Sequence, residues 1–392
     1  MVFEAILFIG VLVVAAKFFG ELMVRINQPT IIGNVLAGII VGPAMFAIVQ
    51  PIDEIELFVS IGVFFLFFLI GLEEINLPKL YKVLRGKIFA GSAIGFLVPF
   101  IAAALFGIAL DMDFIKAFAI ASVIAASSLG VTAKILTDTG RLRSTIGLEI
   151  FTVTGIVEFI AIIVTSVLLQ IDASEGFPET SEFIWLFAKM IIFFVIAGLA
   201  SVYLIPPFFR FIREHLKVEQ MYFAMVIGII LLVAYFAEIS GIHGAIGALL
   251  LGIAVSRMSK EEHHEIGKSV RAIGYGIFIP IFFAGIGLHF STSFVELPIW
   301  IIGGFLAIII GVKFLGSYLA VRVAQMKFPT TVAYGVMSKG AVDLALLLSL
   351  LSAEILDSPL FSLLVLGTLA TMIISSVELQ RKLKKIPEET NP

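Results

Sequence analysis

Stretches of about 20 mostly apolar residues recur along the whole chain, and this recurrence restricts the fold more than any other feature. A helix needs about 20 such residues to cross the hydrocarbon core of a bilayer. Thirteen spans are predicted, roughly at residues 3–23, 30–50, 55–74, 87–110, 115–137, 146–170, 183–208, 220–239, 242–257, 272–288, 297–321, 329–352 and 358–378. The sequence therefore predicts an all-α integral membrane protein.

The overall composition supports this interpretation and excludes several classes of protein. Of the 392 residues, 60% are hydrophobic and 14% are charged, whereas a soluble domain is roughly half apolar and about a quarter charged. The chain has no Cys and its five His are scattered, so thiolate and zinc sites are not expected. No Gly-rich nucleotide-binding loop follows a strand, and no Ser/His arrangement suggests catalysis. We expect no enzyme activity, cofactor, nucleotide-binding domain or nucleic-acid partner.

Lys and Arg concentrate in every second loop, whereas Lys116 is the only base in the remaining loops, which are acidic. The basic residues are Arg25, Lys79, Lys82, Arg85, Lys87, Lys134, Arg141, Arg143, Arg210, Arg213, Lys217, Arg257, Lys260, Lys268, Arg271, Arg322, Lys327 and those of 381–385. Lys and Arg in short loops stay on the cytoplasmic side. The pattern predicts a plasma-membrane protein with its N-terminus outside and its C-terminus in the cytoplasm.

Two parts of the chain resemble each other. Residues 33–41 resemble 247–255, residues 62–73 resemble 277–289, and Leu129-Gly130 less clearly matches Lys339-Gly340. Each pair lies seven predicted spans apart, so the copies must cross the membrane in opposite directions. Inverted repeats are typical of secondary transporters, although chance similarity among Gly- and Phe-rich helices is the alternative. We predict a first six-helix repeat at 1–180, a linker helix at 181–215, a second repeat at 216–380 and a short cytoplasmic tail at 381–392.

Four charged residues fall in the middle of predicted spans, where a charge costs several kcal/mol and needs a reason. They are Glu158, Lys313, Lys339 and Asp343. Lys339 and Asp343 are four residues apart and share a face if their helix is continuous. Purely structural roles are the alternative, with Glu158 paired to Lys313 and Asp343 neutralising Lys339.

Two of the predicted spans are expected to be interrupted. One carries Ser127, Ser128 and Thr132, and the other carries 338–340 at a similar depth. Interrupted helices in membranes line cavities, and their free backbone groups bind ions. Interruptions at related positions of two repeats predict one central site.

Several segments, in order, resemble cation/proton antiporters of the CPA2 type. They are residues 25–33, 36–43, 68–73, 128–134, 280–283 with Gly287-Leu288, and 313–316, and the similarity extends from about residue 5 to 378. The resemblance implies a dimerisation domain and a six-helix core with two crossed, unwound helices, here at 127–132 and 338–342. It also implies a homodimer in which the core moves like an elevator.

The chain departs from this family at the ion site. Where relatives carry Asp-Asp or Asn-Asp, this chain has Val157-Glu158. Where they carry Arg-Gly-Glu, it has Lys339-Gly340-Ala341, with Asp343 two residues further on, and the matching Lys313 is retained. One carboxylate of the pair therefore remains.

The resulting hypothesis is that Glu158 binds a proton and a monovalent cation in turn, with Na⁺ favoured over K⁺. Burial favours the neutral form of a carboxylate, which suits proton binding near neutral pH. Ser127, Ser128, Thr132, Thr154 and carbonyl groups of the interrupted helices are predicted to supply neutral oxygen ligands for this hard cation. One acid predicts electroneutral exchange, whereas proton release from Lys313 as well would make exchange electrogenic.

Two other classes of protein remain open at this point. The loss of one acid could loosen obligatory coupling and leave a cation channel or leak on the same scaffold. The chain could also be a non-transporting sensor. The predicted partners are protons, monovalent cations, membrane lipid and a second copy of the chain.

Overall fold

The computed structural model describes residues 2–73, 86–142, 144–172, 221–240, 244–256, 258 and 260–386, with isolated positions between 188 and 215. Every regular element in these ranges is helical, and nine helical segments are long and apolar enough to cross a membrane. Three shorter apolar helices accompany them. The predicted all-α membrane fold is confirmed, while most of the predicted span 183–208 lies outside the described residues.

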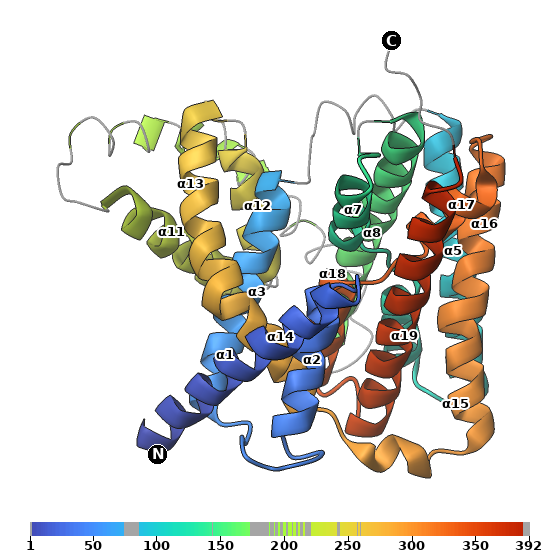
Figure 1. Ribbon diagram of the computed structural model, residues 1–392, viewed down its shortest axis with the longest axis horizontal. Coiled ribbons are helices and arrows are strands. Elements are labelled where there is room, and N and C mark those ends of the chain that lie inside the picture. The colour runs from blue at the N-terminus through green and yellow to red at the C-terminus, as the bar shows by residue number, and fades with distance from the viewer. Residues whose placement is uncertain are drawn as a thin grey trace.

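The helices form two bundles, each built from both parts of the chain (Figure 1). The first bundle contains α1 (Val2–Arg25), α2 (Thr30–Val41), α3 (Asp53–Glu73), α11 (Met221–Ile239), α12 (Gly244–Val255), α13 (Lys260–Ile273), the π-helix η1 (Gly274–Phe278) and α14 (Ile279–Leu288). The short 3-10 helix η2 (Thr292–Glu296) then leads to the second bundle.

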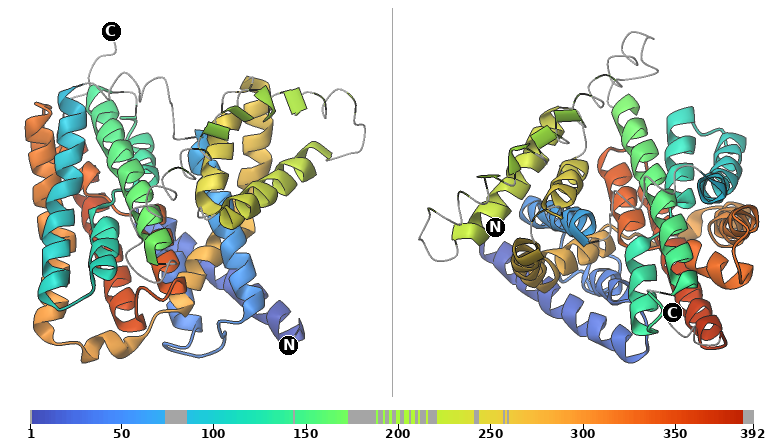
Figure 2. Two further views of the ribbon diagram at one scale, coloured as in Figure 1. Left: turned by 180° about the vertical axis from the view of Figure 1, so that it is seen from behind. Right: turned by 90° about the horizontal axis from the view of Figure 1, so that it is seen from above.

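The second bundle surrounds two helices that are interrupted in the middle. It contains α5 (Lys87–Ala109), α6 (Phe114–Ala125), α7 (Leu129–Asp138), α8 (Thr145–Asp172), α15 (Ile299–Leu306), the π-helix η3 (Ala307–Val312), α16 (Lys313–Val323), α17 (Pro329–Val336), α18 (Ala341–Ser352) and α19 (Ser358–Leu383). Seen from behind, the ribbons of the two bundles diverge toward the upper edge and meet lower down (Figure 2).

Two sequence expectations about helix length are wrong. The predicted span 30–50 is helical only to Val41, because Gly42 and Pro43 follow and a proline disfavours helical backbone in the residue before it. The predicted loop 257–271 is largely the helix α13, which continues through η1 into α14. Ile266 and Val270 lie one turn apart and are both buried, so one face of α13 packs against the bundle although the segment is rich in charge.

Glycines let helices of the first bundle approach at backbone distance. A Cβ on Gly38 of α2 would overlap the carbonyl group of Ala284 in α14, and a Cβ on Gly252 of α12 would overlap that of Phe68 in α3. Small residues at such crossings are typical of membrane helices, whose association depends on close packing. These contacts hold α2 against α14 and α12 against α3.

Gly252→Ala is expected to destabilise the protein by about 1–3 kcal/mol, because the added methyl group must displace backbone rather than a flexible side chain. The measurement is a thermal unfolding curve of the detergent-solubilised protein. Gly10→Ala in α1 is the matched control, since its Cβ would meet nothing within 4 Å. Equal losses of thermal stability in the two variants would contradict the crossing.

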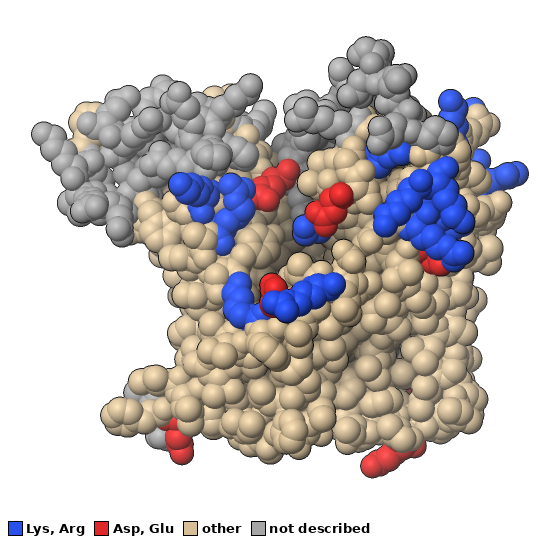
Figure 3. Space-filling model, viewed as in Figure 1, with Lys and Arg blue, Asp and Glu red and all other residues tan. Residues whose placement is uncertain are grey.

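Charges are distributed unevenly between the two ends of the molecule. The charged residues visible along the lower edge of the face in Figure 3 are acidic, whereas Lys and Arg lie higher up. We call the upper end the basic end; it includes the start of α5 and the end of α19. At the opposite end, Lys116 pairs with Asp357 at 2.9 Å.

Candidate ion-binding site

Two helix interruptions meet inside the second bundle. Residues 126–128 separate α6 from α7, and residues 337–340 separate α17 from α18. The backbone N–H of Ser128 donates to the carbonyl oxygen of Ser338 at 2.7 Å. Gly340 lies so close to Ser128 that a Cβ there would overlap the Ser128 hydroxyl group. Both predicted interruptions are present and in direct contact, but they end earlier than the expected 127–132 and 338–342, because α7 begins at Leu129 and α18 at Ala341.

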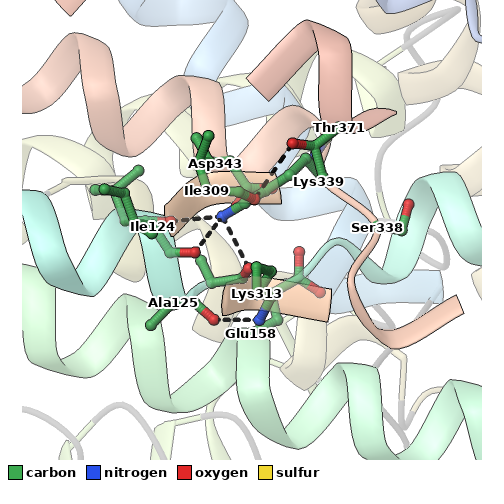
Figure 4. A network of polar contacts seen from close by, with 12 residues as sticks. Ile124, Ala125, Glu158, Ile309, Lys313, Ser338, Lys339, Asp343 and Thr371 are labelled. Carbon is green, nitrogen blue, oxygen red and sulfur yellow. Dashed lines mark hydrogen bonds and ion pairs between the residues drawn. The ribbon is translucent and has the colours of Figure 1, made fainter. Parts of the chain in front are cut away.

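Two lysines occupy the end of α6, as Figure 4 shows. The last carbonyl groups of a helix lack partners within it and carry the negative end of its dipole. The Lys339 ammonium donates to three of the carbonyl oxygens of residues 123–126, at 2.6–2.9 Å. Lys313 donates to the carbonyl oxygen of Ala125 at 2.5 Å. Both ammonium groups are fully buried, and the helix end compensates part of their charge.

Two acids lie against the first turns of α18 and α7. Asp343 accepts a hydrogen bond from the backbone N–H of Gly340 at 2.7 Å and pairs with Lys339 at 2.8 Å. Glu158, on α8, accepts a hydrogen bond from the backbone N–H of Leu129 at 3.0 Å, at the first turn of α7. The positive end of a helix dipole favours an anion in both places. Glu158 is only 4% exposed, so its carboxylate depends on these buried partners.

Two hydroxyl groups near Glu158 stand out because they are buried without a partner. Ser127 lies in the first interruption and Thr154 lies one helical turn before Glu158 on α8, so Thr154 and Glu158 share a face. Both side chains are fully buried, and neither hydroxyl oxygen has a hydrogen-bond partner within the described residues. A buried unsatisfied hydroxyl costs about 1–3 kcal/mol, and its oxygen is a suitable ligand for a hard cation.

Ser128 and Thr132 have a different role from Ser127 and Thr154. The Thr132 hydroxyl donates to the carbonyl oxygens of Ser128 at 2.8 Å and Gly335 at 3.1 Å. The Ser128 hydroxyl caps α7 by accepting from the N–H of Val131 at 3.5 Å. These groups hold the two interruptions together.

The structure brings the predicted site residues into one region and changes some of their expected contacts. The carbonyl groups at the end of α6 bind lysines instead of being free for a cation. Sequence reasoning missed the Leu129 amide, although Ser128 before an apolar run is a helix-start signal that could have indicated it. The suggested ion pair between Glu158 and Lys313 stays a prediction. Val157 is fully buried and faces Gly95 of α5, so apolar packing fills the position where the resemblance implies an Asp or Asn before Glu158.

Comparisons with known proteins agree with this arrangement. The sequence model of the family described as "Sodium/hydrogen exchanger, transmembrane" matches residues 6–385. The chain is 28% identical over 358 residues to a probable Na(+)/H(+) antiporter, GerT, from Bacillus cereus, covering 91% of this chain and 93% of that protein. It is 27% identical over 377 residues to the Na(+)/H(+)-K(+) antiporter GerN of the same organism, covering 96% and 95%.

Two further matches extend over nearly the whole chain. An Na(+)/H(+) antiporter from Enterococcus hirae is 27% identical over 384 residues, covering 97% of this chain and 99% of that protein. The fold resembles that of the sodium proton antiporter MjNhaP1 from Methanocaldococcus jannaschii at pH 8, with a TM-score of 0.66, 18% identity and coverage of 98% and 96%. The interpretation of the sequence as a cation/proton antiporter, and not an enzyme, is confirmed. The chain belongs to the transmembrane sodium/hydrogen exchanger family.

Proposed function

We propose that the protein is a secondary antiporter that exchanges protons for a monovalent cation at Glu158, with Na⁺ favoured over K⁺. The observation that carries the proposal is a buried carboxylate at the start of α7 beside the unpartnered hydroxyl groups of Ser127 and Thr154. The names of the relatives support Na⁺ exchange, and the name of GerN keeps K⁺ as the second candidate.

In this mechanism Glu158 holds either a proton or the cation. When ionised, it accepts the N–H of Leu129 and attracts a desolvated cation, with Ser127 and Thr154 as neutral oxygen ligands. Protonation removes that charge and releases the cation. The neighbouring Val157 is apolar and packed, so one carboxylate titrates for each ion. This supports electroneutral exchange of one proton for one cation.

We also propose the finer architecture predicted from sequence: thirteen spans, two inverted six-helix repeats and two crossed, interrupted helices. Symmetric glycine contacts support the repeats. Gly38 and Gly252 differ by 214 residues, and Gly71 and Gly287 differ by 216. Gly38 and Gly287 lie at the α2–α14 crossing, while Gly252 and Gly71 lie at the α12–α3 crossing. Each crossing therefore pairs the second span of one repeat with the third span of the other.

The second bundle would then be the moving core, and the first bundle the scaffold of a homodimer. The charge distribution supports a plasma-membrane orientation with the basic end in the cytoplasm. The start of α1 and the end of α19 lie at opposite ends of the molecule, in agreement with an outside N-terminus and a cytoplasmic C-terminus (Figure 1).

The test of the proposed function uses purified protein in proteoliposomes with a pH-sensitive dye inside. A cation gradient is expected to drive proton movement, with Na⁺ more effective than K⁺, and clamping the membrane potential is expected to leave the rate unchanged. Cation flux without proton movement would instead indicate a channel. A thermal-shift panel of Li⁺, Na⁺, K⁺ and Rb⁺ gives the ion preference directly. The stabilisation of the protein by the bound cation should decline as the pH falls, because protons compete for the same carboxylate. A protein that no cation stabilises would be a sensor or assembly subunit.

A further inference from the structure

The second bundle carries a group of basic residues around its edge at the basic end. We call the group the basic rim; it consists of Lys87, Arg322, Lys327, Lys382, Lys384 and Lys385. Three contacts join the elements that carry it. Lys87 at the start of α5 bonds to Gln325 at 2.6 Å, and Lys382 at the end of α19 lies 5.5 Å from the ring centroid of Tyr334 in α17. Arg141 bonds to the carbonyl oxygen of Ile386 at 2.6 Å. The rim is therefore one surface built from several helix ends.

Within the part of the chain that the structure describes, most of the charge of this rim has no acidic partner. Arg322, Lys327, Lys384 and Lys385 are exposed and have no acidic partner among the described residues. On the first bundle, in contrast, Arg25 pairs with Glu21 and Arg271 with Glu73. Figure 3 shows the corresponding concentration of basic side chains over the second bundle. Among the described residues, four exposed bases without an acidic partner therefore lie on the second bundle.

An exposed aromatic residue adjoins the rim in an unusual backbone conformation. Phe328 has φ 54° and is 45% exposed, and it directly follows Lys327. A bulky residue in the left-handed region is rare and persists where the surroundings hold it there. Val323, at the end of α16, is 40% exposed. Aromatic and basic side chains placed together are typical of the boundary between hydrocarbon and headgroups.

We propose that the basic rim binds anionic phospholipid headgroups of the bilayer, with Phe328 seated at the interface between headgroups and acyl chains. The lysine and arginine side chains supply positive charge to the phosphodiester groups, and each contributes about fivefold in affinity near an anionic surface. The exposed apolar side chains of Phe328 and Val323 contact the acyl region below. This binding does not depend on exchange activity, so it stands apart from the proposed function.

The experiment compares lipid binding by detergent-solubilised protein, measured by native mass spectrometry and by thermal shift. Phosphatidylglycerol is expected to be retained and to stabilise more than phosphatidylcholine. The triple variant Arg322→Gln/Lys327→Gln/Lys385→Gln is expected to lose about a hundredfold of the phosphatidylglycerol affinity, from three such contributions. Phe328→Asn is expected to weaken retention of both lipids, because asparagine tolerates the left-handed conformation and lacks the ring.

The matched control is Arg25→Gln/Lys268→Gln/Arg271→Gln, which removes the same charge from the first bundle. It should keep the phosphatidylglycerol preference. Equal losses of phosphatidylglycerol affinity in the two triple variants would overturn the proposal, because the net charge of the protein alone would then explain lipid binding. Equal protection of the wild type by inorganic phosphate would also overturn it, in favour of a site for a soluble anion. Unfolding curves in phosphatidylcholine alone establish that each variant is folded.

Discussion

Glu158→Gln is expected to abolish proton-coupled cation exchange. The substitution keeps the shape of the side chain and an oxygen that can accept the Leu129 N–H, but it removes both the charge that attracts a cation and the group that takes a proton. Removing one charged partner from a buried site costs about 3–5 kcal/mol, and 1.4 kcal/mol corresponds to tenfold in affinity. Cation affinity should therefore fall by at least about a hundredfold. The measurement is dye dequenching in proteoliposomes at saturating wild-type ion concentrations.

Two companion variants separate loss of the site from loss of the fold. Glu158→Asp keeps the charge and shortens the side chain by one methylene, so it should retain proton coupling with weaker cation binding. Asp138→Asn removes an exposed acid that pairs with Lys134 at the end of α7 and should exchange like the wild type. A cooperative thermal unfolding transition without added cation establishes that Glu158→Gln is folded. Exchange at the wild-type rate in Glu158→Gln would place the ion elsewhere.

The membrane fold could be predicted from sequence because the length of an apolar segment is itself the physical requirement for crossing a bilayer. The predicted helix boundaries are wrong at two places where hydropathy and backbone geometry disagree. Residues 42–50 are apolar enough to extend a span, yet Gly42-Pro43 ends α2 at Val41. Residues 260–271 are polar, yet they continue as α13 because Ile266 and Val270 lie on one face.

The site could be predicted only in part, for a related reason. The cost of burying charge identified Glu158, Lys313, Lys339 and Asp343. Lys339 does pair with Asp343, at 2.8 Å, but from the interruption before α18 and not along one continuous helix face. The direction in which a long lysine side chain reaches is not encoded locally. The sequence therefore could not reveal that Lys313 and Lys339 bind the carbonyl groups of residues 123–126.

Lys339→Met is expected to be among the most destabilising single substitutions in the protein. The ammonium of Lys339 supplies hydrogen bonds to three carbonyl groups at the end of α6 and the charge opposite Asp343. Methionine has a similar length and supplies neither. Asp343 would then be a buried carboxylate that keeps its hydrogen bond from the N–H of Gly340 but has lost its ion pair with Lys339. Breaking a buried pair in this way costs about 3–5 kcal/mol, which thermal unfolding in detergent would show as a large fall in Tm.

A double-mutant cycle distinguishes the pair from general damage to the core. Asn at position 343 can still accept the N–H of Gly340 without carrying charge, so Lys339→Met/Asp343→Asn should be more stable than Lys339→Met alone. A coupling of about 0.5–3 kcal/mol is expected for residues in one network. Lys339→Arg keeps the charge and should lose far less stability than Lys339→Met. The size of its loss depends on how well the wider guanidinium group fits a fully buried position. If the two single substitutions were additive, Lys339 would act through the carbonyl groups of α6 alone, and the ion pair with Asp343 would contribute nothing to the stability of the interrupted helices.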